Sequence, residues 1–194
     1  MSSFTPKGRV APAFPDLCRR VLDEIGEVLA AVDPAQVDAL VTAILAARRT
    51  YVYGAGRGGL ILRGLAMRMM HVGLSVAVVG EMTTPPIGPG DLLLVNSAKG
   101  AGITTAAVAQ AGRAAGATLA VITAHPEGPI PAQADWVVVL RAPTMADAEG
   151  RSAQPMGAVY EQSLWILGDL LVAYLQAALL VDVAAMRSRH TNLE

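Results

Sequence analysis

Apolar residues recur at helical spacing in the first quarter of the chain. Between Asp16 and Val32, positions 17, 21, 25, 28 and 29 carry Leu, Val, Ile, Val and Leu, which places them near one helix face. Asp33 then offers an N-cap, Pro34 suits the first helical position, and Gln36 is expected to complete a capping-box-like pair. This second helix is predicted to run to about Arg49. Residues 1–15, which contain three prolines, are expected to form an arm before one domain, 16–194.

From position 50 onward, short Val- and Leu-rich segments alternate with helical patterns. The predicted strands are Thr50–Tyr53, Ser75–Val79, Asp91–Asn96, Thr118–Thr123 and Trp136–Leu140. The predicted helices are about Gly58–Val72 and Ile103–Ala115, and a long region Met156–Ala185 closes the chain. This alternation predicts an α/β fold with a five-stranded parallel sheet covered on both faces. The flavodoxin-like, doubly wound strand order is expected, with ligands at the carboxyl ends of the strands.

Composition narrows the classes of function. A net charge of -1 without a basic cluster argues against nucleic-acid binding. The single Cys18 excludes an internal disulfide framework and a cysteine metal site, and it fits a cytoplasmic location. The most hydrophobic segment, 164–185, contains Asp169, Gln176 and Asp182, which are costly at membrane depth. We therefore expect a helix buried by protein, with another subunit covering part of it, and no membrane partner.

A glycine-rich turn follows the first predicted strand, in Tyr51-Val-Tyr-Gly-Ala-Gly-Arg-Gly-Gly59, and opens directly into a helix. Such a turn directs backbone N–H groups and the positive end of a helix dipole at one point, where an anion binds favourably. The third glycine is misplaced for the dinucleotide pattern G-x-G-x-x-G. The acidic residue of that pattern is also not clear, since Glu81 lies beyond a glycine after the second strand.

Three motifs together resemble a known family. They are Gly54-Ala-Gly-Arg-x-Gly, Ala66-Met-Arg-x-Met-His71-x-Gly and Val79-Gly-Glu-x-x-Thr-Pro-Pro86. They resemble the sugar isomerase (SIS) domain and, more narrowly, the 6-phospho-3-hexuloisomerases. Gln154-Pro-Met-Gly-x-x-x-Glu-Gln162 and His190-x-Asn-Leu-Glu194 agree with this resemblance. It implies a five-stranded SIS fold, a homotetramer or dimer with active sites at subunit contacts, and neither a metal nor an organic cofactor.

The anion-binding loop departs from the family pattern. Where SIS domains read roughly Ser-Gly-Ser-Gly-Glu-Thr, this chain reads Ser97-Ala-Lys-Gly-Ala-Gly102. Lys99 stands where a hydroxyl is expected, and Gly58 stands in the first turn where the family has serine. Lys99 could supply the lost donors to an ordinary phosphosugar. Alternatively, the loop suits an anion of lower charge than a phosphate monoester, such as a sulfonate.

Two side chains are candidates for the proton transfers of a sugar isomerase. Glu161 is the expected base, because it begins the closing helix within the motif that resembles the family's catalytic segment. His71, at the end of the first sheet helix, is the expected partner for oxygen protons or ring opening, with a helix cap as its structural alternative. His190 lies in a tail that could reach a neighbouring subunit or remain a cap, and His125 is expected to be an ordinary loop residue.

The remaining candidates are expected to bind the substrate. Arg57 could pair with the anion or orient Glu81. The substrate-binding set is Gly54, Gly56, Arg57, Gly58, Glu81, Thr83, Thr84, Asn96, Ser97, Lys99, Gly100, Thr104, Gln154 and His190. The three histidines are too scattered for a metal site, and we see no nucleophilic triad, P-loop or zinc spacing.

The leading hypothesis is an aldose–ketose type isomerase that works through an enediol on a hexose or hexulose with an anion at C6. The family implies 3-hexulose 6-phosphate and fructose 6-phosphate. A sulfonated-sugar isomerase, converting sulfoquinovose to sulfofructose, is the alternative suggested by the loop. A non-catalytic sugar-anion-binding regulator is the rival from another class, and a scaffold subunit is a third.

Overall fold

A computed structural model describes residues 12–147 and 152–193 of the chain. Its centre is a five-stranded sheet of β1 (Thr50–Gly54), β2 (Val76–Val78), β3 (Leu92–Asn96), β4 (Thr118–Thr123) and β5 (Trp136–Val139). Every strand pair is parallel, and the order is β2-β1-β3-β4-β5. This is the flavodoxin-like order, so the predicted fold class is confirmed.

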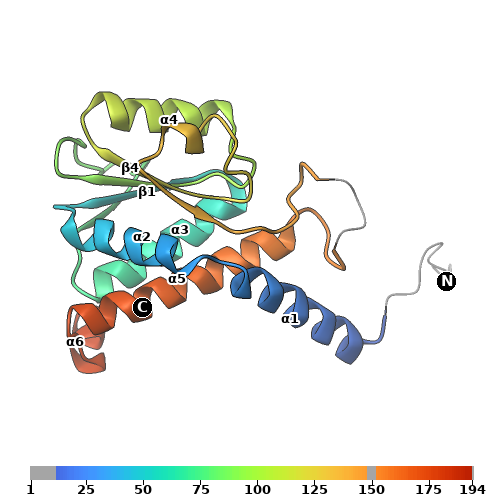
Figure 1. The fold of residues 1–194 in the computed structure, drawn as a ribbon. Coiled ribbons are helices and arrows are strands. Elements are labelled where there is room, and N and C mark those ends of the chain that lie inside the picture. The colour runs from blue at the N-terminus through green and yellow to red at the C-terminus, as the bar shows by residue number, and fades with distance from the viewer. Residues whose placement is uncertain (1–11, 148–151, 194) are drawn as a thin grey trace, which may run out of the picture.

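Helices cover both faces of the sheet (Figure 1). They are α1 (Phe14–Ala30), α2 (Pro34–Ala46), α3 (Gly56–His71), α4 (Ile103–Ala114), α5 (Ala158–Ala178) and α6 (Val183–Ser188), with a 3₁₀ turn at Pro131–Gln133. In Figure 1, α4 lies on one face, and α2 and α3 lie on the other with α5 packed outside them. Alternate strand residues therefore enter two cores: Val52 and Leu94 face α2, α3 and α5, whereas Tyr51 and Leu93 face α4.

The start of α2 follows the predicted N-cap but not the predicted capping box. Asp33 accepts a hydrogen bond from the Ala35 N–H at 2.9 Å. Gln36, however, accepts one from the Val139 N–H at 2.9 Å instead of reaching back to the cap. Because β5 is an edge strand, this donor has no neighbouring strand to bond, and α2 supplies the acceptor. The capping-box prediction for Gln36 is wrong.

Two other predicted boundaries shift. The first helix begins at Phe14, inside the predicted arm 1–15, because Pro15 falls in the first turn, where a missing N–H costs nothing. Residues 1–11 of that arm lie outside the described part of the chain. The closing region is not one helix to position 185: α5 ends at Ala178, and Asp182 caps α6 by accepting a hydrogen bond from the Ala185 N–H at 2.7 Å.

The closing helix α5 has two contrasting sides. Its inward residues Leu164, Leu167, Leu171 and Leu175 are fully buried against α1, α2 and α3. On its outward side Trp165 is 51% exposed and Tyr174 is 55% exposed, with Ile166 and Leu170 between them. Among the described residues, protein therefore covers the inward side of the helix and leaves these outward side chains exposed.

Among the described residues, membrane-spanning length and apolarity are not found together in any single helix. The bent pair α1 and α2, which meets at 75°, passes such a test only when the two are joined.

Candidate active site

The turn between β1 and α3 is built by backbone packing. Gly54 ends β1, and a Cβ on Gly59 would lie 2.3 Å from the Gly54 carbonyl oxygen, so a side chain at position 59 is excluded. Gly56 opens α3 with a φ of 56°, a left-handed conformation that glycine adopts without strain. The N–H groups of the first turn of α3 therefore lie at the carboxyl edge of the sheet, as the sequence predicts.

Arg57 at the start of α3 pairs with Glu161 near the start of α5. The Arg57 Nη1 and Glu161 Oε2 atoms lie 2.7 Å apart, and the two side chains are 60% and 18% exposed. The alternative in which Arg57 orients Glu81 is wrong, since Glu81 pairs with Arg63 instead. The Arg57 guanidinium and the N-terminal end of α5 therefore both lie beside the carboxylate that is the candidate base.

The Ser97–Gly102 loop joins β3 to α4 and packs closely on the loop that follows β4. Gly100 has a φ of 65°, and a Cβ there would lie 2.5 Å from the His125 carbonyl oxygen. The Gly100 carbonyl also accepts the Ile130 N–H at 3.0 Å. Ser97 is buried, and its hydroxyl donates to the Ala101 carbonyl at 3.3 Å, inside the loop. Of this loop's predicted ligands, Lys99 is the one with an exposed, charged side chain.

Lys99 and Glu161 line the same small pocket, of about 90 Å³. Its other walls are Ala98, Thr144, Met145, Met156, Gly157 and Tyr160. The structure therefore brings together the predicted anion ligand, from the loop after β3, and the predicted base, from the first turn of α5. The pocket is smaller than the roughly 300–1,000 Å³ of typical small-molecule sites, so a hexose phosphate would fill it only in part.

The missing hydroxyl at position 58 has a steric reason. A Cβ on Gly58 would lie 2.2 Å from Asn96 Nδ2, so the Asn96 side chain occupies the space that a serine would need. Asn96 Oδ1 in turn accepts the Tyr160 hydroxyl at 2.7 Å, and burial raises the pKa of Tyr160. Asn96 and Gly58 thus join β3, α3 and α5 behind the pocket. They support the site from behind rather than line its surface.

Several predicted ligands lie away from this pocket. Glu81, Thr83 and Thr84 line a separate hollow along the edge strand β2, and the Thr84 hydroxyl donates to the Val78 carbonyl. Thr104 is exposed on the first turn of α4. Gln154 Nε2 is a buried atom without a hydrogen-bond partner among the described residues.

The two histidine candidates lie together, but far from Glu161. His71 ends α3 and is 3% exposed, and its ring stacks on that of His190 with centroids 5.1 Å apart. The neighbouring Arg189 side chain donates to the His71 carbonyl at 2.9 Å and so ties the C-terminal segment to the end of α3. Because α3 has 16 residues, its ends are about 20 Å apart at the usual rise. Within one chain, His71 and Glu161 cannot act on the same sugar.

Sequence reasoning missed the turn at Thr144–Asp147, which forms one wall of the pocket. Asp147 Oδ2 accepts the Thr144 N–H at 2.6 Å and the Thr144 hydroxyl at 2.9 Å. A threonine and an aspartate three residues apart, after a predicted strand, are a usual signal for such a turn. In the described part of the chain, no group of three or more His, Cys, Asp or Glu side chains is arranged to hold a metal ion.

Comparison with known proteins identifies the class. The SIS domain model matches residues 43–165, and the chain belongs to this family. It is 41% identical over 177 residues to a 3-hexulose-6-phosphate isomerase of Mycobacterium gastri, covering 90% of this chain and 88% of the relative. A Bacillus subtilis (strain 168) protein of the same name is 31% identical, with coverages of 90% and 95%.

A solved structure agrees with this assignment. It is a hypothetical protein of Methanococcus jannaschii, whose title infers a function of 3-hexulose-6-phosphate isomerase. It superposes with a TM-score of 0.80 at 28% identity, covering 92% of this chain and 99% of that one.

Proposed function

We propose that the chain is a sugar phosphate isomerase that interconverts 3-hexulose 6-phosphate and fructose 6-phosphate. The observation that carries the proposal is the shared pocket of Lys99 and Glu161 at the carboxyl edge of the sheet. This is the edge where open α/β sheets bind ligands. The proposal also rests on the 41% identity to a relative named for this reaction.

The reaction requires proton transfers that Glu161 can begin. The Glu161 carboxylate takes the proton from C2 of the 3-ketose, the electron pair forms the C2–C3 double bond, and the C3 carbonyl becomes the enediolate oxygen. The O2–H proton then passes to the enediolate oxygen on C3, the carbonyl forms at C2, and Glu161 returns its proton to C3. Arg57 Nη1, 2.7 Å from Glu161 Oε2, would hold the carboxylate in position.

The anion at C6 would be held by Lys99 together with backbone N–H groups at the starts of α3 and α4. The Lys99 side chain brings a full positive charge, whereas the hydroxyl of Ser97 is directed into its own loop. Gly58 lacks a hydroxyl because Asn96 fills that space. Lysine with helix N-termini is a sufficient set of donors for a phosphate. Among the described residues, no contact specifically favours a sulfonate.

We also propose that the site is completed in a homo-oligomer, a tetramer or a dimer, in the cytoplasm. The outward residues of α5, with Leu60 and Met67 of α3, form an apolar surface of the kind that subunits cover. The pocket is small for the substrate, and the His71–His190 pair lies far from Glu161 of its own chain. A second copy that brings its histidine pair to the pocket would solve both problems. No nucleic acid or membrane partner is proposed.

Isomerisation in heavy water tests the proposal. Incubation with fructose 6-phosphate should place solvent deuterium on the carbon skeleton and produce 3-hexulose 6-phosphate, both measurable by NMR. Parallel incubation with sulfoquinovose should leave its carbon-bound protons unchanged. Exchange with sulfoquinovose alone would move the assignment to the sulfonated sugar, and exchange with neither would refute the isomerase function for these substrates. A bound sugar that is never exchanged would favour the regulator.

A further inference from the structure

His125 connects the two segments that form opposite walls of the pocket, the Ser97–Gly102 loop and the Thr144–Asp147 turn. Its side chain does not line the pocket itself. It follows β4 in the loop that packs on Gly100, so its backbone is fixed to the Lys99 side of the site. Its N–H donates to the Thr123 hydroxyl at 3.0 Å, and the neighbouring Ala124 N–H donates to the Ala98 carbonyl at 3.1 Å. The backbone of His125 is therefore attached to the Ser97–Gly102 loop by packing and hydrogen bonds.

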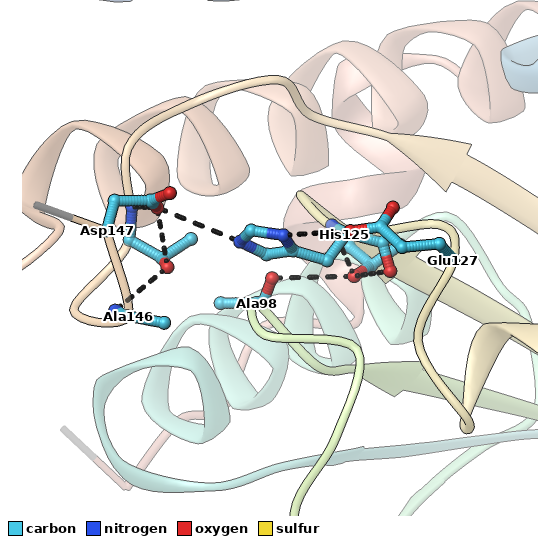
Figure 2. Close-up of polar contacts among 7 residues, drawn as sticks. Ala98, His125, Glu127, Ala146 and Asp147 are labelled. Atoms are coloured by element: carbon cyan, nitrogen blue, oxygen red, sulfur yellow. Dashed lines mark hydrogen bonds and ion pairs between the residues drawn. The ribbon is translucent and has the colours of Figure 1, made fainter.

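The imidazole of His125 extends from this backbone toward the Thr144–Asp147 turn on the opposite wall. Figure 2 shows the ring between two carboxylates, with Nδ1 3.2 Å from Glu127 Oε1 and Nε2 3.7 Å from Asp147 Oδ2. Asp147 Oδ2 is also the atom that accepts the N–H and hydroxyl of Thr144. His125 Nε2 is a buried atom with no hydrogen bond from the described residues, so Asp147 is the group it faces.

The contact continues from this turn to the catalytic helix. A Cβ on Gly157 would lie 3.0 Å from the Met145 nitrogen and 3.1 Å from Thr144 Cα, so the turn packs directly on Gly157. The Gly157 carbonyl accepts the Glu161 N–H in the first turn of α5. Displacement of the Thr144–Asp147 turn would therefore be passed to the backbone that carries Glu161.

We infer that His125 is a positioning residue that couples the anion-binding loop to the catalytic helix. Through Asp147, it sets the distance between the Lys99 wall and the Glu161 wall of the pocket. A sugar held by its anion at Lys99 presents its reacting carbon to Glu161 only when that distance is right. The inference rests on the proposed isomerase function for its kinetic test but not for its structural test.

The kinetic test uses His125→Ala, Asp147→Asn and the double variant, with fructose 6-phosphate as substrate. Each single change should lower kcat by about 10- to 100-fold, the range expected when a base is displaced by an ångström, and should change KM by less than about three-fold. The double variant should be no slower than the slower single variant, because either change already breaks the same contact. His125→Gln should recover most of kcat, because its amide can still donate to Asp147.

Glu127→Gln is the matched control, because Glu127 contacts the same ring from its solvent side and is 73% exposed. It should keep kcat within about two-fold, as expected for an exposed pair. The inference is overturned if His125→Ala keeps wild-type kcat, if the two single losses multiply in the double variant, or if Glu127→Gln is as damaging as His125→Ala.

Hydrogen exchange without any sugar separates this inference from the proposed function. In His125→Gln and Asp147→Asn, which retain polar side chains for folding, amide exchange is compared with the wild type. We expect faster exchange at 144–147 and at the first turn of α5 in Asp147→Asn, unchanged exchange in α2, and a smaller effect in His125→Gln. An inactive wild-type protein would refute the isomerase function alone, whereas unchanged exchange at 144–147 in Asp147→Asn would refute the coupling role.

Discussion

The amino ends and the carboxyl ends of the parallel strands form two opposite rims of the sheet, here called the amino edge and the carboxyl edge. These two edges differ in how completely their polar groups are paired. At the amino edge, Asp91 is 1% exposed and accepts hydrogen bonds from Arg48 Nε at 3.0 Å, Arg48 Nη2 at 2.9 Å and the Gly88 N–H at 2.9 Å. Asp135 likewise accepts from the Leu119 N–H and from Arg113. At the carboxyl edge, Glu161 Oε2 is buried beside Arg57 without an aligned hydrogen bond.

This difference in pairing indicates that the polar groups of the amino edge stabilise the fold, whereas those of the carboxyl edge are available to a substrate. Buried polar atoms without partners lower stability, so a protein keeps them where a ligand supplies the missing bonds. Gln154 Nε2 and Gln162 Oε1, which lie in the same motif as Glu161, are buried atoms of this kind among the described residues. The His71–His190 stack is the exception, because it places titratable rings at the end of α3 that is remote from Glu161. Pairing between copies of the chain would account for this exception.

The largest expected effect is at Glu161. Glu161→Gln preserves the shape of the side chain but removes the base, so kcat should fall by about 10³-fold, within the range for general base catalysis. Binding of fructose 6-phosphate, measured by calorimetry, should remain within several-fold of the wild type. Asp23→Asn, an exposed acid on α1, is the control and should leave both unchanged. A Glu161→Gln protein that still exchanges deuterium at a tenth of the normal rate would show that another group is the base.

Mixing two inactive variants tests the role of the histidine pair. Glu161→Gln chains refolded together with His71→Gln chains should regain roughly a quarter of the wild-type activity in a dimer, since hybrid sites can combine an intact Glu161 with an intact His71. The same mixture is made with His190→Asn, which changes the exposed ring of the stack and spares the buried one.

The outcome of this mixing separates a shared site from one contained in a single chain. If the two parent variants are inactive and folded by their melting temperatures, but neither mixture regains activity, the histidines do not act across subunits. Full activity of His71→Gln and His190→Asn on their own would remove both histidines from the mechanism. The chemistry would then be confined to the carboxyl edge, and the two edges would differ more sharply.

Much of this architecture can be predicted from local pattern. The strand order follows from five short apolar segments alternating with helices, and the position of Glu161 on the first turn of α5 follows from its motif. These features depend on periodicity and on residues close together in sequence. The position of the α3 N-terminus at Gly56 could also be predicted, because the turn and the helix that follows it are adjacent in the chain.

Contacts between distant segments could not be predicted in this way. Gln36 fits a capping box locally, but it bonds a β5 donor that lies about a hundred positions later in the chain. Gly58 resembles a lost serine until Asn96 is seen to fill its space. His125 is an ordinary loop residue by sequence, since its relation to Asp147 depends on how the loops after β4 and β5 meet. In each case tertiary packing decides the role of a residue with several plausible local roles.

At the amino edge, the expected effect is on stability alone. Hydrogen bonds from Arg48, opposed by burial and assisted by the Gly88 N–H, lower the pKa of Asp91 below its ordinary value. A lowered pKa in the folded protein means that this stabilisation is present above the unfolded pKa of about 3.9 and is lost as the pH falls through the folded value. Asp91→Asn should therefore lower the free energy of unfolding by about 1–3 kcal/mol at neutral pH and weaken the loss of stability in acid.

The kcat of folded Asp91→Asn should match that of the wild type, because Asp91 lies at the edge of the sheet opposite to Glu161. Urea unfolding at pH 7 and pH 3.5 measures the stability, and Asp16→Asn, which removes an exposed carboxylate paired with Arg19, serves as the control. The control should change stability by less than about 1 kcal/mol at either pH, as exposed ion pairs do. A large loss of kcat in Asp91→Asn, with its fold intact, would mean that the amino edge takes part in the chemistry.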